Sequence, residues 1–154
     1  MGRELHASFE AAREVFDRVS QAIGIDVAEM CFESSEETLR STENAQVALY
    51  TCGLAGYRAL VSRLGEGKIR ALAGHSVGEY AAVAACGSLS IEDGALLVRK
   101  RGELMAQSGS ARPGTMAAVM GLDAEVLAEL LSQIACGTVV IANDNCPGQL
   151  VISG

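Results

Sequence analysis

Apolar residues recur at helical spacing through much of the chain. Between residues 4 and 22 they are separated by three and four positions, which predicts an amphipathic helix that ends at Gly24. The polar residues 34–42 predict a loop or a short helix. The mostly apolar residues 43–64 predict a long helix, with Thr42 as its N-cap. A series of helices is therefore expected in the first part of the chain.

The middle of the chain combines small residues with short apolar runs. Gly53 and Gly56 lie inside the predicted long helix, where glycine is unfavourable unless another backbone packs close by, so we place this helix in the interior. Residues 69–73 predict a short, buried parallel strand, and the Ala-rich residues 77–86 predict a helix directly after it. Ser90 with Asp93 then forms a capping-box pattern, which predicts a further helix over residues 90–107 with Ser90 as its N-cap.

The pattern changes after residues 108–114, which are linker-like. The elements expected beyond them are a strand at 115–120, a helix at 124–134, a strand at 138–142, a turn at 143–148 and a strand at 149–153. A unit of this β-α-β-β type normally needs a further helix and strand to cover its apolar face. We therefore expect the chain to end inside a domain.

Composition and charge narrow the fold and the function classes. The core must be aliphatic, because aromatics make up 4% of the residues and there is no Trp, and this favours helices packed on a sheet. A net charge of −7 argues against nucleic-acid binding. No apolar run approaches the ~20 residues that span a membrane. The five Cys form no metal-binding spacing, so we expect free thiols, no metal site and a cytoplasmic location.

The strongest chemical signal is a G-x-S-x-G motif centred on Ser76, between the predicted strand and helix. A nucleophilic serine needs a sharp turn that exposes its hydroxyl, and we expect Gly74 and Gly78 to relieve crowding there. The N–H of Val77, at the start of the helix, is the expected oxyanion donor. His75 is a poor base for Ser76, since adjacent residues in a tight turn point in different directions. A glycine-serine turn without chemistry is the alternative.

A second candidate is Arg101 in the next predicted helix. Its neighbours at helical spacing are Leu97, Val98, Leu104 and Met105, all apolar, so an unpaired guanidinium there would be unfavourable. Arginine binds carboxylates well because its planar fork contacts both oxygens. The spacing alone leaves three interpretations open: an internal ion pair, a side chain that extends its charged end to solvent, or binding of an anionic ligand.

Several separated stretches resemble the malonyl-CoA:acyl carrier protein transacylases and the related acyltransferase domains of polyketide and fatty-acid synthases. These stretches are residues 42–46, 74–82, 87–90, 97–102 and 143–154. The resemblance implies an α/β fold in two parts. Residues 1–110 would form part of an α/β-hydrolase-like subdomain with a parallel strand and a nucleophile elbow, and residues 111–154 the first part of a ferredoxin-like small subdomain.

The resemblance also implies a reaction, the transfer of a malonyl group from malonyl-CoA to acyl carrier protein in fatty-acid biosynthesis. Ser76 would become acylated, and Arg101 would bind the free malonyl carboxylate. An acetyl group would leave that arginine unpaired, which is a physical basis for selectivity. No cofactor is expected besides malonyl-CoA as substrate.

Two parts of the family pattern have no match. The opening strand with its Gly-Gln-Gly-type loop would precede Met1, and the catalytic histidine would lie beyond Gly154. We therefore expect an incomplete, inactive or nearly inactive piece. Two other function classes stay open. A serine esterase of the α/β-hydrolase type shares the G-x-S-x-G motif but has no need of Arg101, and a non-catalytic remnant would bind a partner without turnover.

Overall fold

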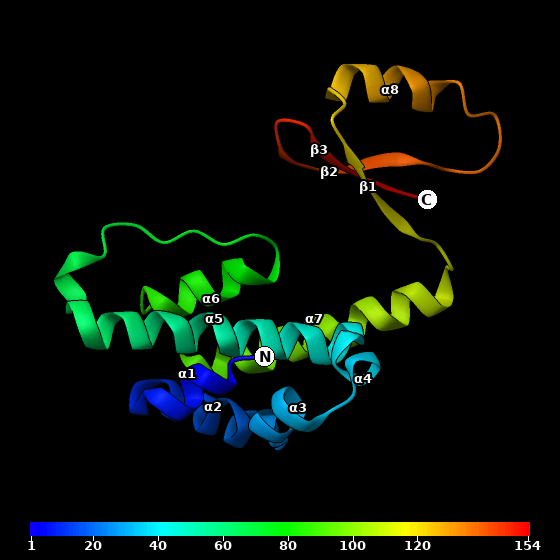
Figure 1. The fold of residues 1–154 in the computed structure, drawn as a ribbon. Coiled ribbons are helices and arrows are strands. Elements are labelled where there is room, and N and C mark those ends of the chain that lie inside the picture. The colour runs from blue at the N-terminus through cyan, green and yellow to red at the C-terminus, as the bar shows by residue number, and fades with distance from the viewer. The chain divides into compact units, whose positions relative to one another are not determined.

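The computed structural model describes residues 1–154, apart from the side chain of Glu66. The chain divides into two compact units, Met1–Ser108 and Gly109–Gly154. The division falls within two residues of the predicted boundary after residue 110. Each unit is described below by itself (Figure 1).

The first unit is helical. Its elements are α1 (Arg3–Ser8), α2 (Glu10–Ile23), α3 (Val27–Glu33), α4 (Glu36–Arg40), α5 (Thr42–Leu64), the short 3-10 helix η1 (Glu66–Lys68), α6 (Val77–Ala85) and α7 (Ile91–Ala111), whose last turn passes the division. None of the described helices is both long enough and apolar enough to cross a membrane.

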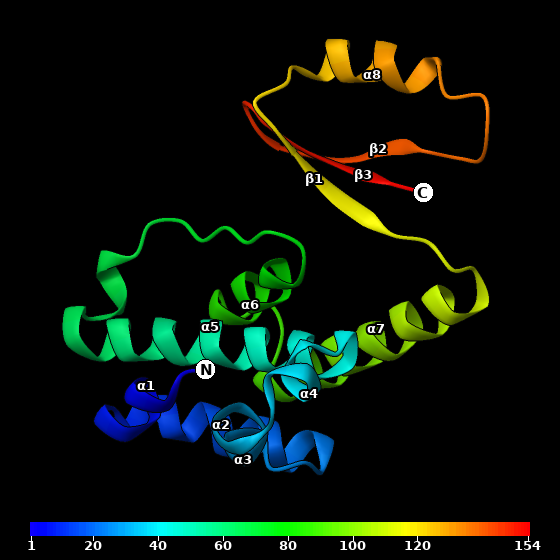
Figure 2. The same ribbon diagram turned by 45° about the vertical axis from the view of Figure 1, so that its right-hand side comes forward.

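Helix α5 forms the centre of this unit. It lies between α2 and α6 in both views (Figures 1 and 2). Its Tyr50 and Leu54 are buried with Phe16 of α2. A Cβ at Gly53 would lie 3.6 Å from Ala81 of α6, in ordinary van der Waals contact. The predicted interior position of the long helix is therefore confirmed.

Several details of the predicted helices in the first unit were wrong. The first predicted helix is two helices, because the backbone at Phe9 is extended (φ −130°, ψ 123°). Helix α3 was not predicted, although Asp26 caps it by accepting a hydrogen bond from the Glu29 N–H at 2.8 Å. The N-cap of α5 is Ser41, whose side chain accepts from the Asn44 N–H, and Thr42 is already helical.

The predicted parallel strand at residues 69–73 is absent. These residues form part of an irregular loop between η1 and α6 (Figure 1), and Leu72 is 38% exposed. A strand exists only when a neighbouring strand completes its hydrogen bonds, and the described residues of the first unit contain no other strand. Apolar composition alone was therefore insufficient to predict this element.

The second unit is a small sheet with one helix. Its elements are β1 (Met116–Met120), α8 (Ala124–Ser132), β2 (Val140–Cys146) and β3 (Gln149–Ser153). The sheet order is β1-β3-β2, and both pairings are antiparallel. Leu127 of α8 and Leu150 of β3 are buried. The predicted order of elements is confirmed, but β2 continues to Cys146, which shortens the predicted turn to residues 147–148.

Two glycines let α7 lie against α5. A Cβ at Gly94 would overlap the side chain of Tyr50, whose hydroxyl donates to the Ile91 carbonyl at 3.0 Å. A Cβ at Gly102 would lie 2.8 Å from the Glu43 Cα. Burial, with Glu92 nearby, raises the pKa of Tyr50 to about 12, so its phenol remains a neutral donor at ordinary pH. The two contacts fix the position of α7 along α5.

We expect Gly102→Ala to lower the free energy of unfolding by about 1–3 kcal/mol, because the added methyl group forces two backbones apart. Gly109→Ala is the matched control on the same helix, since a Cβ there meets nothing within 4 Å. The control should leave stability unchanged or raise it by up to about 1 kcal/mol. Urea unfolding followed by circular dichroism measures both. Equal stability of the two variants would contradict the close approach of α7 to α5.

Candidate functional site

Ser76 adopts a strained backbone conformation immediately before α6. Its φ is 55° and its ψ is −115°, and among the described residues no other non-glycine has a positive φ. Such conformations cost on the order of 1–3 kcal/mol and persist only where the surroundings hold them. A Cβ at Gly74 would overlap the backbone of Gly78 and Glu79, so glycine is required there. A Cβ at Gly78 would meet nothing within 4 Å, so its predicted role in relieving crowding was wrong.

The turn exposes Ser76 at the N-terminus of α6. The N–H of Gly78 donates to the His75 carbonyl at 2.9 Å, and the N–H of Glu79 donates to the Ser76 carbonyl at 3.1 Å. Among the described residues, the Val77 N–H donates no backbone hydrogen bond. The first N–H groups of a helix lack partners within the helix, so this donor can bond to an acceptor from outside α6.

Arg101 of α7 reaches the same turn. Its Nη2 donates to the Ser76 Oγ at 3.0 Å, and its Nη1 donates to the Oε1 of Gln46 in α5. No described carboxylate pairs with Arg101, whereas its neighbours Arg99 and Lys100 both pair with Glu103. The contacts within the described residues therefore do not support an internal ion pair. The guanidinium is instead hydrogen-bonded to two neutral groups, the Gln46 amide and the hydroxyl of the exposed Ser76.

Gln46 is the site residue to which sequence reasoning gave no role. It is 5% exposed, and its Nε2 donates to the Sδ of Met105 at 3.2 Å. A polar side chain within a helix assigned to the interior needs a partner, and that was the available signal. Both polar atoms of the amide thus bond to side chains of α7, Nε2 to Met105 and Oε1 to Arg101. With its own position fixed in this way, Gln46 orients the guanidinium of Arg101.

A shallow, mostly apolar pocket of about 410 Å³ adjoins the guanidinium. Its walls come from α6 and α7, and its lining residues are Tyr80, Leu97, Lys100, Arg101, Leu104, Met105 and Ser108. Two cations at its edge make it suited to a small ligand with an apolar part and an anionic group. Among the described residues, no group of three His, Cys, Asp or Glu side chains could hold a metal ion.

Comparison with known proteins assigns the family. Residues 1–154, the whole chain, match the family described as acyl transferase domain. The chain belongs to the acyl transferase family. The resemblance inferred from the separated motifs is thereby confirmed.

The acyl transferase relatives include close matches in sequence and structure. A malonyl CoA-acyl carrier protein transacylase of Bacillus subtilis is 40% identical and matches 100% of this chain and 49% of its own length. The crystal structure of an acyl-carrier-protein S-malonyltransferase from Bartonella henselae is 42% identical, with a TM-score of 0.90, over 100% of this chain and 50% of that one.

A third similar structure is a malonyl-transacylase solved in complex with a type II PKS acyl-carrier protein, 33% identical with a TM-score of 0.88, over 100% of this chain and 50% of that one. The acyl transferase chain described here thus spans about half the length of the relatives that it matches. The mixed α/β class is confirmed in its coarse form, as a mostly helical structure with a small antiparallel sheet.

We expect Gln46→Leu to lower the free energy of unfolding by about 1 kcal/mol, because the Arg101 guanidinium loses a buried acceptor. Gln46→Glu is the matched control, since its carboxylate can accept the same hydrogen bond as a charged partner. At neutral pH this control should be close to the original chain in stability. Urea unfolding measures both variants. An unchanged Gln46→Leu variant would show that the amide does not hold the arginine.

Proposed function

We propose that this chain carries the acyl-accepting serine and the carboxylate-binding arginine of a malonyl-CoA:acyl carrier protein transacylase. The observation that carries the proposal is the 3.0 Å hydrogen bond between Arg101 Nη2 and Ser76 Oγ on a strained, exposed turn. Malonyl transfer needs a nucleophile and an anion-binding group close enough for one short acyl chain to reach both. In this pair the two groups are in direct contact, so a malonyl group on Ser76 would carry its carboxylate to the guanidinium.

In the proposed reaction, Ser76 Oγ attacks the thioester carbonyl of malonyl-CoA. The carbonyl oxygen becomes an oxyanion that accepts a hydrogen bond from the Val77 N–H, and the coenzyme A thiolate leaves as the seryl ester forms. The thiol of the carrier protein's phosphopantetheine then takes the malonyl group and frees Ser76. A serine hydroxyl needs a general base to lose its proton. We expect that base to be the family's histidine, from the part of the family fold that these residues do not match.

The proposed role of Arg101 follows from its hydrogen bonds. Gln46 holds Nη1, so the guanidinium keeps its orientation while Nη2 exchanges the Ser76 hydroxyl for a malonyl carboxylate oxygen. A charged acceptor forms the stronger hydrogen bond, so malonyl binding also releases the nucleophile. An acetyl group offers no such acceptor. This requirement favours malonyl transfer over the esterase alternative, since a neutral ester does not use the arginine.

The proposal extends to the setting of the reaction. The first unit would be part of an α/β-hydrolase-like subdomain with a nucleophile elbow, and the second the first part of a ferredoxin-like one. Acyl carrier protein would be the partner, in fatty-acid biosynthesis, and the reaction needs no cofactor besides the substrate malonyl-CoA. The free cysteines fit a reducing, cytoplasmic setting.

We expect malonyl-CoA to add a malonyl group to Ser76 slowly, because these residues supply no assigned base for the hydroxyl proton. Intact-mass measurement with peptide mapping follows the adduct over time. Ser76→Ala should abolish it, and Ser108→Ala, at the edge of the adjoining pocket, should not. An adduct that persists in Ser76→Ala would reject this serine as the nucleophile. Tight malonyl-CoA binding without any adduct would favour the non-catalytic remnant.

Arg101→Ala should weaken malonyl-CoA binding about 10- to 100-fold, because a charged hydrogen bond contributes about 1.5–3 kcal/mol. Acetyl-CoA binding should stay unchanged, since acetyl lacks the carboxylate. Isothermal titration calorimetry with both thioesters gives the comparison. Arg99→Ala is the control on the same helix, because that side chain is engaged by Glu103 and the Ile23 carbonyl. Equal losses for both thioesters would reject a carboxylate-binding role.

A further inference from the structure

The thioether of Met105 takes no part in the proposed reaction, yet it contacts the same arrangement of side chains. Met105 lies one turn after Arg101 on α7 and lines the apolar pocket of about 410 Å³ beside the guanidinium. The residue is 47% exposed, and its Sδ accepts the hydrogen bond from Nε2 of Gln46 at 3.2 Å. A small molecule in the pocket can therefore reach a side chain whose sulfur bonds to a buried amide.

This sulfur decides which way the Gln46 amide faces. The two ends of a glutamine amide have nearly the same shape, but the oxygen accepts hydrogen bonds and the nitrogen donates them. Arg101 Nη1 is a donor and needs the oxygen, whereas the Met105 thioether has no hydrogen to donate and needs the nitrogen. Both contacts are satisfied in one orientation of the amide only. Without the sulfur acceptor, that orientation loses one of its two supports.

Oxidation of the thioether removes this acceptor. A sulfur lone pair attacks one oxygen of a hydroperoxide, so that an S–O bond forms and the O–O bond breaks. With hydrogen peroxide, the transferred oxygen gives its proton to the departing oxygen, which leaves as water. Sulfur is oxidised and the peroxide is reduced. The product, methionine sulfoxide, is polar, and its oxygen replaces the sulfur as the acceptor.

The space between Met105 and Gln46 is too short for the added oxygen. An N–H···O hydrogen bond has an N···O distance of about 2.9 Å. Sδ and Nε2 are 3.2 Å apart, and the S–O bond would have to fit within the same span. An oxygen added on the amide side therefore pushes the amide away, and one added on the pocket side leaves Nε2 without its acceptor. A buried donor without a partner is unfavourable, so the amide leaves its orientation in either case.

We propose that Met105 is a reversible oxidation site at which a hydroperoxide disables the carboxylate-binding arginine. The displaced amide no longer presents Oε1 to Nη1, so the guanidinium of Arg101 loses the buried contact that orients it. Methionine sulfoxide reductases return the sulfoxide to the thioether, which restores the contact. The loss of malonyl binding rests on the proposed function, whereas the oxidation site and the movement of the amide do not.

A second exposed methionine provides the matched control. Met120 is 65% exposed on β1 of the second unit, so peroxide reaches it at least as easily as Met105. Leucine in place of either residue keeps an apolar side chain of similar size and removes the sulfur. The test therefore compares the original chain with Met105→Leu and Met120→Leu. The exposed cysteines are first blocked with iodoacetamide, so that peroxide acts on methionine; they are Cys86, Cys136 and Cys146.

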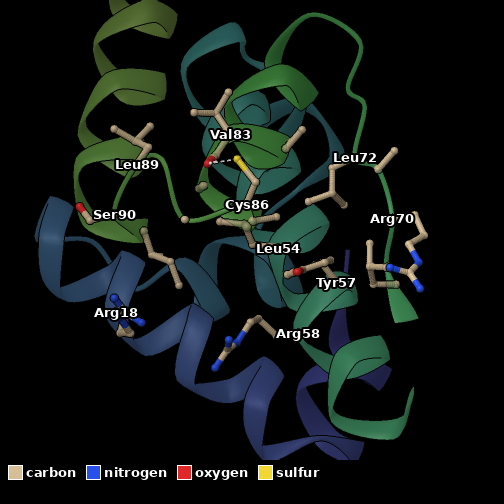
Figure 3. Close-up of a pocket in the computed structure, with 17 residues that line it drawn as sticks. Arg18, Leu54, Tyr57, Arg58, Arg70, Leu72, Val83, Cys86, Leu89 and Ser90 are labelled. Atoms are coloured by element: carbon tan, nitrogen blue, oxygen red, sulfur yellow. Dashed lines mark hydrogen bonds between the residues drawn. The ribbon is translucent and has the colours of Figure 1, made fainter. Parts of the chain in front are cut away.

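The first readout is the NMR spectrum of the 15N-labelled chain before and after hydrogen peroxide, with oxidation of Met105 followed by peptide mass spectrometry. The Nε2 hydrogens of Gln46, assigned by their loss in Gln46→Leu, and the Nε–H of Arg101 should shift. The backbone amides of Leu54 and Tyr57 should not shift. These two residues lie about two to three turns further along α5 and line a separate groove (Figure 3).

Three outcomes of this comparison would overturn the proposal. The first is that the Gln46 and Arg101 signals stay in place after complete oxidation of Met105. The second is that Met120 becomes oxidised at peroxide concentrations that leave Met105 intact. The third is that the amides of the separate groove shift as much as the Gln46 signals, which would show a general loosening of the helices.

The second readout is binding of malonyl-CoA and acetyl-CoA by isothermal titration calorimetry after removal of the peroxide. Oxidation should weaken malonyl-CoA binding about tenfold or more in the original chain and in Met120→Leu, and leave acetyl-CoA binding unchanged. Methionine sulfoxide reductases for both sulfoxide epimers should restore the affinity. Met105→Leu should bind malonyl-CoA equally before and after peroxide.

The proposed function and the oxidation site fail on different results. If the untreated chain does not prefer malonyl-CoA to acetyl-CoA, the proposed function fails, and the NMR comparison decides whether Met105 controls the amide. If malonyl-CoA is preferred but oxidation of Met105 changes the binding of neither thioester, or of both equally, the control of Arg101 by Met105 is overturned and the proposed function stands.

Discussion

The guanidinium of Arg101 connects the three helices on which the candidate site depends. It extends from α7, donates to Gln46 in α5 and donates to Ser76 at the start of α6. Each contact limits the others, because a planar guanidinium with one nitrogen held by a buried amide has little freedom to rotate. The approach of α7 to α5 at Gly102 places the arginine within reach. Helix packing, hydrogen bonding and the serine turn therefore form a single arrangement.

The serine turn itself stores strain that the fold must offset. Gly74 lets the backbone of Gly78 and Glu79 pass close by, where a side chain at position 74 would overlap it. On the far side of the turn, the N–H groups of these first α6 residues donate to the carbonyls of His75 and Ser76. The near side is the loop at residues 69–73, whose backbone has no described hydrogen bond.

Sequence patterns predicted the helices well because amphipathic spacing and caps are local. The interior position of α5, the Ser90 cap of α7 and the order of elements in the second unit are confirmed. The predicted strand at 69–73 failed because a strand depends on hydrogen bonds to distant residues. The role assigned to Gly78 failed for a related reason, since crowding depends on the path of the backbone through the turn. The backbone of Gly78 and Glu79 passes against Gly74, so a side chain would be blocked at Gly74 and not at Gly78.

The sequence by itself determined the sharp turn at Ser76, the helix that follows it, and the need of Arg101 for a polar partner. These follow from steric limits and from side chains within a few positions of each other. Only the tertiary structure decided that the partner is the serine hydroxyl, 25 residues away, together with Gln46, 55 residues away. Such contacts depend on how whole helices pack, because sequence spacing carries no information about the distance between separate helices.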